Sequence, residues 1–157
     1  MTNRERVIAS FSHRRPDKTP YQMGFTQKAL AAMEAYCGDR DFLSRIHNCA
    51  AGVAAAPGPK CGPIDDTTYQ DSFGVRWDRS IDKDIGNVCN CLVPERDLGQ
   101  LELPDPDDPA RFEGMEARCR ELHEAGRFVQ FGIGFSLFER AWTLRGMENL
   151  FIDMVEA

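Results

Sequence analysis

The chain has 157 residues, of which 42% are hydrophobic, 28% charged and 10% aromatic. This composition is typical of one globular domain, and it excludes a disordered tail, a collagen and a membrane-spanning protein. Lys and Arg number 19 against 25 Asp and Glu, so the formal net charge is -6. No overall positive field exists to attract nucleic acid or anionic lipid.

The N-terminus lacks the apolar segment of a secretory signal, because charged residues interrupt it throughout residues 1–16. The longest uncharged stretch, residues 48–59, consists mainly of Ala, Gly and Pro and is too short to cross a bilayer. We therefore expect a cytoplasmic protein. In that compartment the six cysteines are expected to be free thiols.

The first third of the sequence predicts two helices and a strand. Thr2 and Glu5 fit a capping box at the start of a helix. Residues 19–25 have the pattern of a short strand, and Thr26 can cap a second helix that Gly38 ends. Together they predict one strand–helix unit.

The middle of the chain changes character. A third helix is expected to start at Asp39 or Asp41 and to fade into the Ala-rich stretch and the break at residues 57–59, after which we expect a loop. Two strand-like runs follow, residues 73–77 and 88–93, with a polar segment between them. They predict a hairpin near residues 71–94.

The last third again alternates helix and strand. An acidic, proline-rich connector leads into a helix expected over residues 109–125. Residues 128–135 are apolar nearly throughout, as in a parallel strand covered on both faces. Helical spacing then continues from Met147 to the end of the sequence. We expect an α/β protein in which residues 1–157 form a single domain that is truncated in mid-helix.

Four segments, taken in order, resemble the N-terminal half of the uroporphyrinogen decarboxylase family. They are the helix at residues 4–7 leading to residues 14–17, the DSFGVRW run at 71–77, the LPDP connector at 103–106, and the run GFSLFERAWTLRGMENLFIDM at 134–154. The resemblance spans nearly the whole chain and implies a (β/α)8 TIM barrel, which needs about 250 residues. The chain is therefore expected to be a partial barrel, its N-terminal half, with the hairpin inserted.

The family contains true decarboxylases, which act on a porphyrinogen without a cofactor, and relatives that transfer methyl groups to or from a corrinoid, often with zinc. In true decarboxylases the first strand continues into Met-Arg-Gln-Ala-Gly-Arg-Tyr, whereas residues 23–28 read MGFTQK here. Guanidinium forks hold carboxylates in a way that neither glycine nor lysine reproduces. The resemblance therefore favours a corrinoid-linked methyltransferase acting on a methylated small molecule or a corrinoid protein.

Two alternatives stay open. One is a true uroporphyrinogen decarboxylase of porphyrin biosynthesis, with a tetrapyrrole substrate. The other is a non-catalytic half-barrel that binds a ligand or a partner through its sheet edge and forms a homodimer.

No cofactor is assigned to this chain alone, although the resemblance implies corrinoid and zinc in the complete protein. The family's zinc ligands, a His-x-Cys pair and a distant Cys, belong to its C-terminal half. His47 and Cys49 have the same spacing as that pair, but we do not expect them to bind one zinc ion, because a helix would point them roughly 200° apart.

The active site of a barrel lies at the carboxyl ends of its strands, which here are expected near residues 22–26 and 133–139. Catalytic candidates are Asp65, Glu139 and Arg140, and substrate-binding candidates are Gln22, Met23, Gly134, Phe138 and Trp142.

Each candidate has a structural interpretation as well. Asp65 fits a turn equally well, and Glu139 with Arg140 fits an ion pair that holds a loop. The aromatic rings of Phe138 and Trp142 fit helix packing, and Met23 fits a barrel core.

Overall fold

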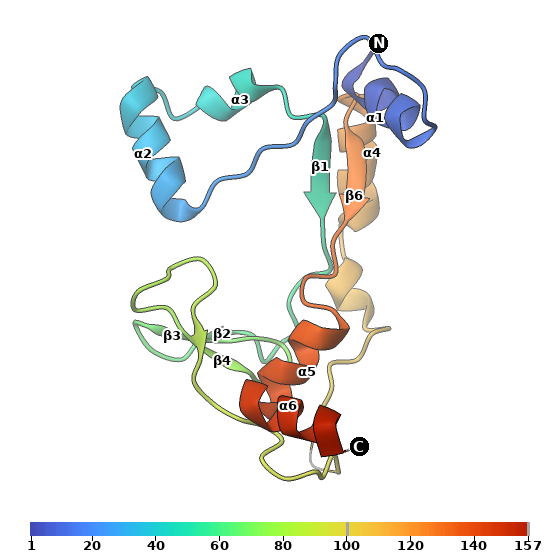
Figure 1. Cartoon of the computed structure of the whole chain (residues 1–157). Coiled ribbons are helices and arrows are strands. Elements are labelled where there is room, and N and C mark those ends of the chain that lie inside the picture. Colours follow the sequence, from blue (N-terminus) through green and yellow to red (C-terminus); the bar gives the residue numbers. More distant parts are fainter. Residues whose placement is uncertain (100, 157) are drawn as a thin grey trace. The chain divides into compact units, whose positions relative to one another are not determined.

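A computed structural model describes residues 1–99 and 101–156 (Figure 1). It is a mixed α/β structure with two compact units, each made of two chain segments. The first unit comprises Met1–Ala55 and Phe112–Gly132, and the second comprises Ala56–Arg111 and Ile133–Ala157. The single domain expected over residues 1–157 stays a prediction.

The helices that begin the first unit form where the caps predict them. In α1 (Asn3–Phe11) the Thr2 hydroxyl accepts the Glu5 amide, and the Glu5 carboxylate accepts the Thr2 amide at 2.7 Å. Helix α2 (Gln27–Cys37) is capped by Thr26 and ends at Gly38, whose φ of 62° is left-handed. Helix α3 (Phe42–Ile46) follows as a single short segment.

Two parallel strands form the centre of the first unit. Strand β1 (Ala50–Val53) pairs with β6 (Phe128–Phe131) in the register Ala50 to Phe128. Helix α4 (Met115–Glu124) precedes β6 in the chain, and both α1 and α4 pack against both strands. The buried side chains of this unit come from α1, α3, α4 and β1, and from Cys49 just before β1.

The predicted strand over residues 19–25 does not form. The segment is extended, but only the Cys49 amide bonds to its backbone in ladder fashion, at Tyr21 O. The next position is filled by the side chain of Asn48, which accepts the Met23 amide and donates to the Met23 carbonyl, both at 2.8 Å. Because the Asn48 side chain, and not a backbone peptide group, bonds to Met23, the backbone hydrogen-bond ladder with residues 19–25 ends there.

Other expectations need correction. Strand β1 lies inside the Ala-rich stretch, where the sequence predicted only the fading end of a helix, because Ala and Gly carry little strand signal. Strand β6 ends at Phe131, which is 52% exposed, so it is not covered on both faces. The helix expected over residues 109–125 is a 3-10 turn, η1 (Pro109–Phe112), and then α4, since Gly114 between them has a left-handed φ of 72°.

The second unit contains an antiparallel sheet of four short strands in chain order. They are β2 (Gly62–Pro63), β3 (Thr68–Gln70), β4 (Arg76–Asp78) and β5 (Asn87–Val88). The pairing of β4 with β5 confirms the hairpin predicted near residues 71–94. The sequence did not predict β2 and β3, which extend this hairpin into a sheet.

Two helices complete the second unit, α5 (Leu137–Arg145) and α6 (Met147–Glu156). Thr143 of α5 is fully buried, as is Val75, and Trp77 and Val93 are nearly so. The helical spacing predicted from Met147 onward is confirmed by α6.

The six cysteines are free thiols. Among the helices formed by residues 1–99 and 101–156, none has the length and apolar character needed to span a membrane.

Candidate functional site

Gln22 and Met23, two predicted substrate-binding residues, line a cavity of about 450 Å³ in the first unit. We call it the Arg127 cavity. The extended segment supplies one part of its wall, and α2, α3, β1 and α4 supply the rest. Its apolar lining consists mainly of Met23, Phe25, Leu30, Leu43 and Leu122.

Three charged side chains line this cavity, those of Arg127, Arg118 and Asp41. The Arg127 guanidinium donates to the backbone oxygen of Asn48 and forms no ion pair with the residues that the structure describes. Arg118 also lines the cavity but is paired with Glu121 at 2.7 Å. Asp41 is the carboxylate of the wall. The cavity suits a ligand with an apolar body and an acidic group beside Arg127.

Arg140 and Trp142 both lie in the second unit, where Arg140 binds Asp71 and Trp142 packs on Trp77. The Asp71 carboxylate accepts four hydrogen bonds. These come from the Phe73 amide at 2.9 Å, the Val75 amide at 3.0 Å, Trp77 Nε1 at 3.3 Å and Arg140 Nη1 at 2.8 Å. A carboxylate held on all sides in this way fixes structure, since no lone pair faces outward to act as a base.

Aromatic rings surround the Arg140 guanidinium. It lies 3.9 Å from the Phe73 ring centre and 5.9 Å from that of Phe135. Trp77 stacks on Phe135 at 5.4 Å and meets the edge of Trp142 at 6.5 Å. Arg140 Nε is buried without a hydrogen-bond partner among the described residues. We call these residues, with Asp71, the Asp71 cluster.

The ion pair at this position therefore joins Arg140 to Asp71 rather than to Glu139. Glu139 is half-buried on the same helix and has no ionic partner among the described side chains. Trp142 packs on Trp77, which agrees with its structural interpretation. Phe138 lies against Phe151 at 6.4 Å.

The other predicted site residues lie outside both groups. Asp65 occupies the exposed turn between β2 and β3, where it accepts the amides of Thr67 at 2.9 Å and Thr68 at 2.8 Å. These backbone hydrogen bonds hold the pKa of Asp65 below its ordinary value. Gly134 has a left-handed φ of 66° in the segment between β6 and α5, with open space where a side chain would be.

The expected helical relation of His47 to Cys49 is wrong, because α3 ends at Ile46. His47 is exposed with a left-handed φ of 55°, and Cys49 is buried at the entry to β1. Across residues 1–99 and 101–156, no three or more His, Cys, Asp or Glu side chains are grouped so as to hold a metal ion.

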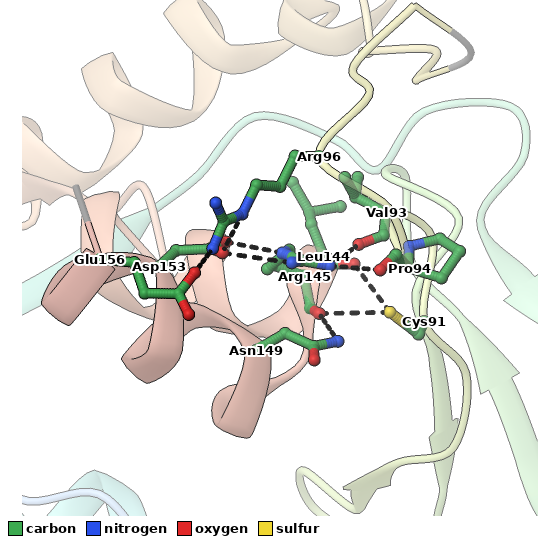
Figure 2. Close-up of polar contacts among 9 residues, drawn as sticks. All are labelled: Cys91, Val93, Pro94, Arg96, Leu144, Arg145, Asn149, Asp153 and Glu156. Carbon is green, nitrogen blue, oxygen red and sulfur yellow. Dashed lines mark hydrogen bonds and ion pairs between the residues drawn. The ribbon is translucent and has the colours of Figure 1, made fainter.

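A further polar cluster joins α5 and α6 to the segment after β5 (Figure 2). Arg145 Nε lies 2.7 Å from Asp153 Oδ2, and Arg145 Nη1 donates to the carbonyls of Val93, at 2.9 Å, and Pro94. Arg96 Nε also donates to Asp153, at 2.8 Å. The Cys91 thiol donates to the Arg145 carbonyl at 3.2 Å. Every one of these bonds fixes the helix junction.

The sequence analysis missed Arg127 and Asp71. Arg127 carried a signal, since it is a lone cation between a helix-ending glycine and an apolar strand. Asp71 opens the DSFGVRW run, but only the folded chain shows that its carboxylate meets Arg140, which lies 69 residues later.

We compared the chain with protein-family models, curated proteins and solved structures, and none of them matches it.

Proposed function

We propose that the chain is the N-terminal part of an enzyme of the uroporphyrinogen decarboxylase family, and that this enzyme transfers a methyl group between a small molecule and a corrinoid protein. The single observation that supports it most is the parallel pair β1 and β6, with α4 packed against both strands. A strand, a helix and a parallel neighbouring strand are the repeating unit of a (β/α)8 barrel. The partial barrel is thus part of the proposal.

The extended segment at residues 19–25 supports the same proposal. It runs beside the start of β1, tied by the Cys49 amide to Tyr21 and by Asn48 to Met23. That is where the first strand of a barrel would meet the second.

The order of the chain adds further support. The segments that follow β1 and β6 supply the whole second unit, which contains Arg140 and Trp142. In barrel enzymes the loops after the strands carry the site residues. The methyl-transfer branch is favoured because residues 23–28 contain no arginine to grip several carboxylates.

The described residues do not fit a zinc centre, since they include no suitable group of ligands. In the proposed reaction the corrinoid would be a substrate carried by a partner protein. The chain's own contribution is the Arg127 cavity, which would orient the apolar part of a small substrate with its acidic group at Arg127. We place this activity in the cytoplasm.

The test compares two reactions of the purified protein that contains this chain. With methylcobalamin and a thiol acceptor, we expect loss of the methyl–cobalt absorbance. With uroporphyrinogen, we expect no release of carbon dioxide. Arg127→Met should reduce methyl transfer, whereas Arg120→Met, on the exposed face of α4, should leave it unchanged. Decarboxylation without methyl transfer would establish the true decarboxylase instead.

One observation favours the non-catalytic half-barrel. Strands β1 and β6 form a sheet of two strands among the described residues, and a sheet this small is marginally stable unless its edges are covered. A homodimer would cover them. Sedimentation at several protein concentrations tests this alternative. A chain that stays monomeric and folded at every concentration would rule out the homodimer.

A further inference from the structure

A second cavity of the first unit, of about 340 Å³, is lined by hydrogen-bond donors and cations. It lies between α1, the segment after α1 and the residues that enter β1. Its polar lining consists of Asn3, Arg6, Lys18, Thr19, Tyr21 and His47. Among the described residues no carboxylate lines it, although the chain as a whole is acidic. We call it the Lys18 cavity.

Arg6 is already engaged beside this cavity. Its Nε and Nη2 donate to the two carboxylate oxygens of Asp17 at 2.7 and 2.9 Å, and its Nη1 donates to Asn3 Oδ1 at 2.8 Å. The guanidinium fork is therefore occupied and its charge compensated. Arg6 is a rigid wall of the cavity rather than a free binding group.

Three other side chains have donors to spare. The Lys18 ammonium, the Thr19 hydroxyl and the His47 imidazole form no hydrogen bond or ion pair with the residues that the structure describes. His47 is also the left-handed cap of α3. The charge that remains uncompensated in the wall is that of Lys18.

We propose that the Lys18 cavity binds a phosphate group, either inorganic phosphate or a small phosphate ester. An arginine fork binds either a carboxylate or a phosphate through two parallel hydrogen bonds, but the fork of Arg6 is taken by Asp17, so a ligand would meet Lys18, Thr19 and His47 instead. A lysine point charge with a hydroxyl and an imidazole suits the several oxygens of a phosphate group. The volume lies at the small end of ligand sites. This inference does not depend on the proposed function.

Calorimetric titration of the whole protein with inorganic phosphate tests the inference. Lys18→Met should weaken binding about tenfold or more, because it removes a charged donor. His47→Asn should also weaken it, since asparagine tolerates the left-handed backbone but lacks the imidazole. The matched control is Lys28→Met, which removes an exposed lysine on α2 outside the cavity.

The effects of the three substitutions on phosphate binding decide whether the Lys18 cavity is a phosphate site. Saturable phosphate binding that Lys18→Met and His47→Asn weaken, and Lys28→Met does not, supports the inference. Equal losses of phosphate affinity in all three variants would show that phosphate is attracted to the protein's cations in general, and would overturn the inference. Acetate that binds as tightly as phosphate, or absence of binding at millimolar phosphate, would overturn it as well. Circular dichroism of each variant confirms that the fold is retained.

Discussion

Asp71 shows how much of the second unit depends on one side chain. Its two oxygens hold the turn before β4, the indole of Trp77 and the guanidinium of Arg140. The side chains of Asp71 and Arg140 are only 18% and 19% exposed. If one of them were removed, water could therefore replace few of the hydrogen bonds that the other would lose. Removing either partner leaves a charge in largely apolar surroundings.

Asp71→Ala should therefore lower the free energy of unfolding by about 2 to 3 kcal/mol. Urea denaturation measures this change. In a double-mutant cycle with Arg140→Met, the two losses should not add, because both substitutions break the same pair. Asp65→Ala is the control, since Asp65 holds only an exposed turn and its loss should cost less than about 1 kcal/mol. Equal effects at the two aspartates would contradict this account of the Asp71 cluster.

At this scale the sequence singled out Arg140 and Trp142 because of their place after a strand, but it predicted none of their contacts. In the structure Arg140 binds Asp71 and lies over Phe73, and Trp142 packs on Trp77. Their partners Asp71, Phe73 and Trp77 come from a segment more than 60 residues earlier. No local pattern encodes such a contact, because it depends on how β4 and α5 pack.

At the scale of elements, α6 is tied to the rest of its unit through Asp153. This carboxylate accepts Arg145 Nε at 2.7 Å and Arg96 Nε at 2.8 Å (Figure 2). The Arg145 hydrogen bond is the main cause of the lowered pKa of Asp153. The unfolded chain therefore takes up this proton at a higher pH than the folded chain does.

The stabilisation from Asp153 should be present above pH about 4, the ordinary aspartate range, and should be lost as the pH falls below it. Thermal unfolding of the protein and of Asp153→Asn should differ at pH 7 and converge in acid. In an Arg145→Met background, Asp153→Asn should change the pH profile much less. A difference that stays constant down to pH 2 would show that the hydrogen bonds to Asp153 contribute nothing specific to the charged form.

Helices whose ends carry a capping residue or a stop glycine were predictable, whereas strands without such end signals were not. The capping box of Thr2, the Thr26 cap and the Gly38 stop all confirm predicted helix ends. Strand β1 was missed because Ala50, Ala51 and Gly52 are residue types depleted in strands, and Val53 alone has a strand preference. The predicted strand at residues 19–25 failed because Asn48 pairs with Met23 by its side chain. The pattern there indicated extended backbone correctly but could not predict its partner.

At the scale of the whole molecule, each unit has its own buried side chains. Val7, Phe42, Cys49 and Leu122 are buried in the first unit, and Val75, Trp77, Val93 and Thr143 in the second. The chain passes between the units three times. The entropy cost of closing a loop grows only slowly with loop length, so we expect the two units to open separately.

Val75→Ala should cost about 2 kcal/mol and should speed hydrogen exchange in the second unit only. Its matched counterpart, Val7→Ala, should do so in the first unit only. Exchange measured by mass spectrometry on peptides from β1 and β4 distinguishes the two. Loss of protection throughout the chain from either variant would instead support a single cooperative domain over residues 1–157.

Two asparagine side chains stand in for peptide groups. Asn48 does so beside Met23, and Asn90 accepts the Arg76 amide at 2.8 Å and donates to the Gly74 carbonyl at 3.0 Å. Unlike a peptide group, such an amide can lose ammonia. Deamidation would replace the donor with a second acceptor, which would face the carbonyl that it now binds. Chemical ageing at Asn48 would therefore weaken the hold on Met23 while the Cys49 amide still binds Tyr21, and the gain of one dalton would report it.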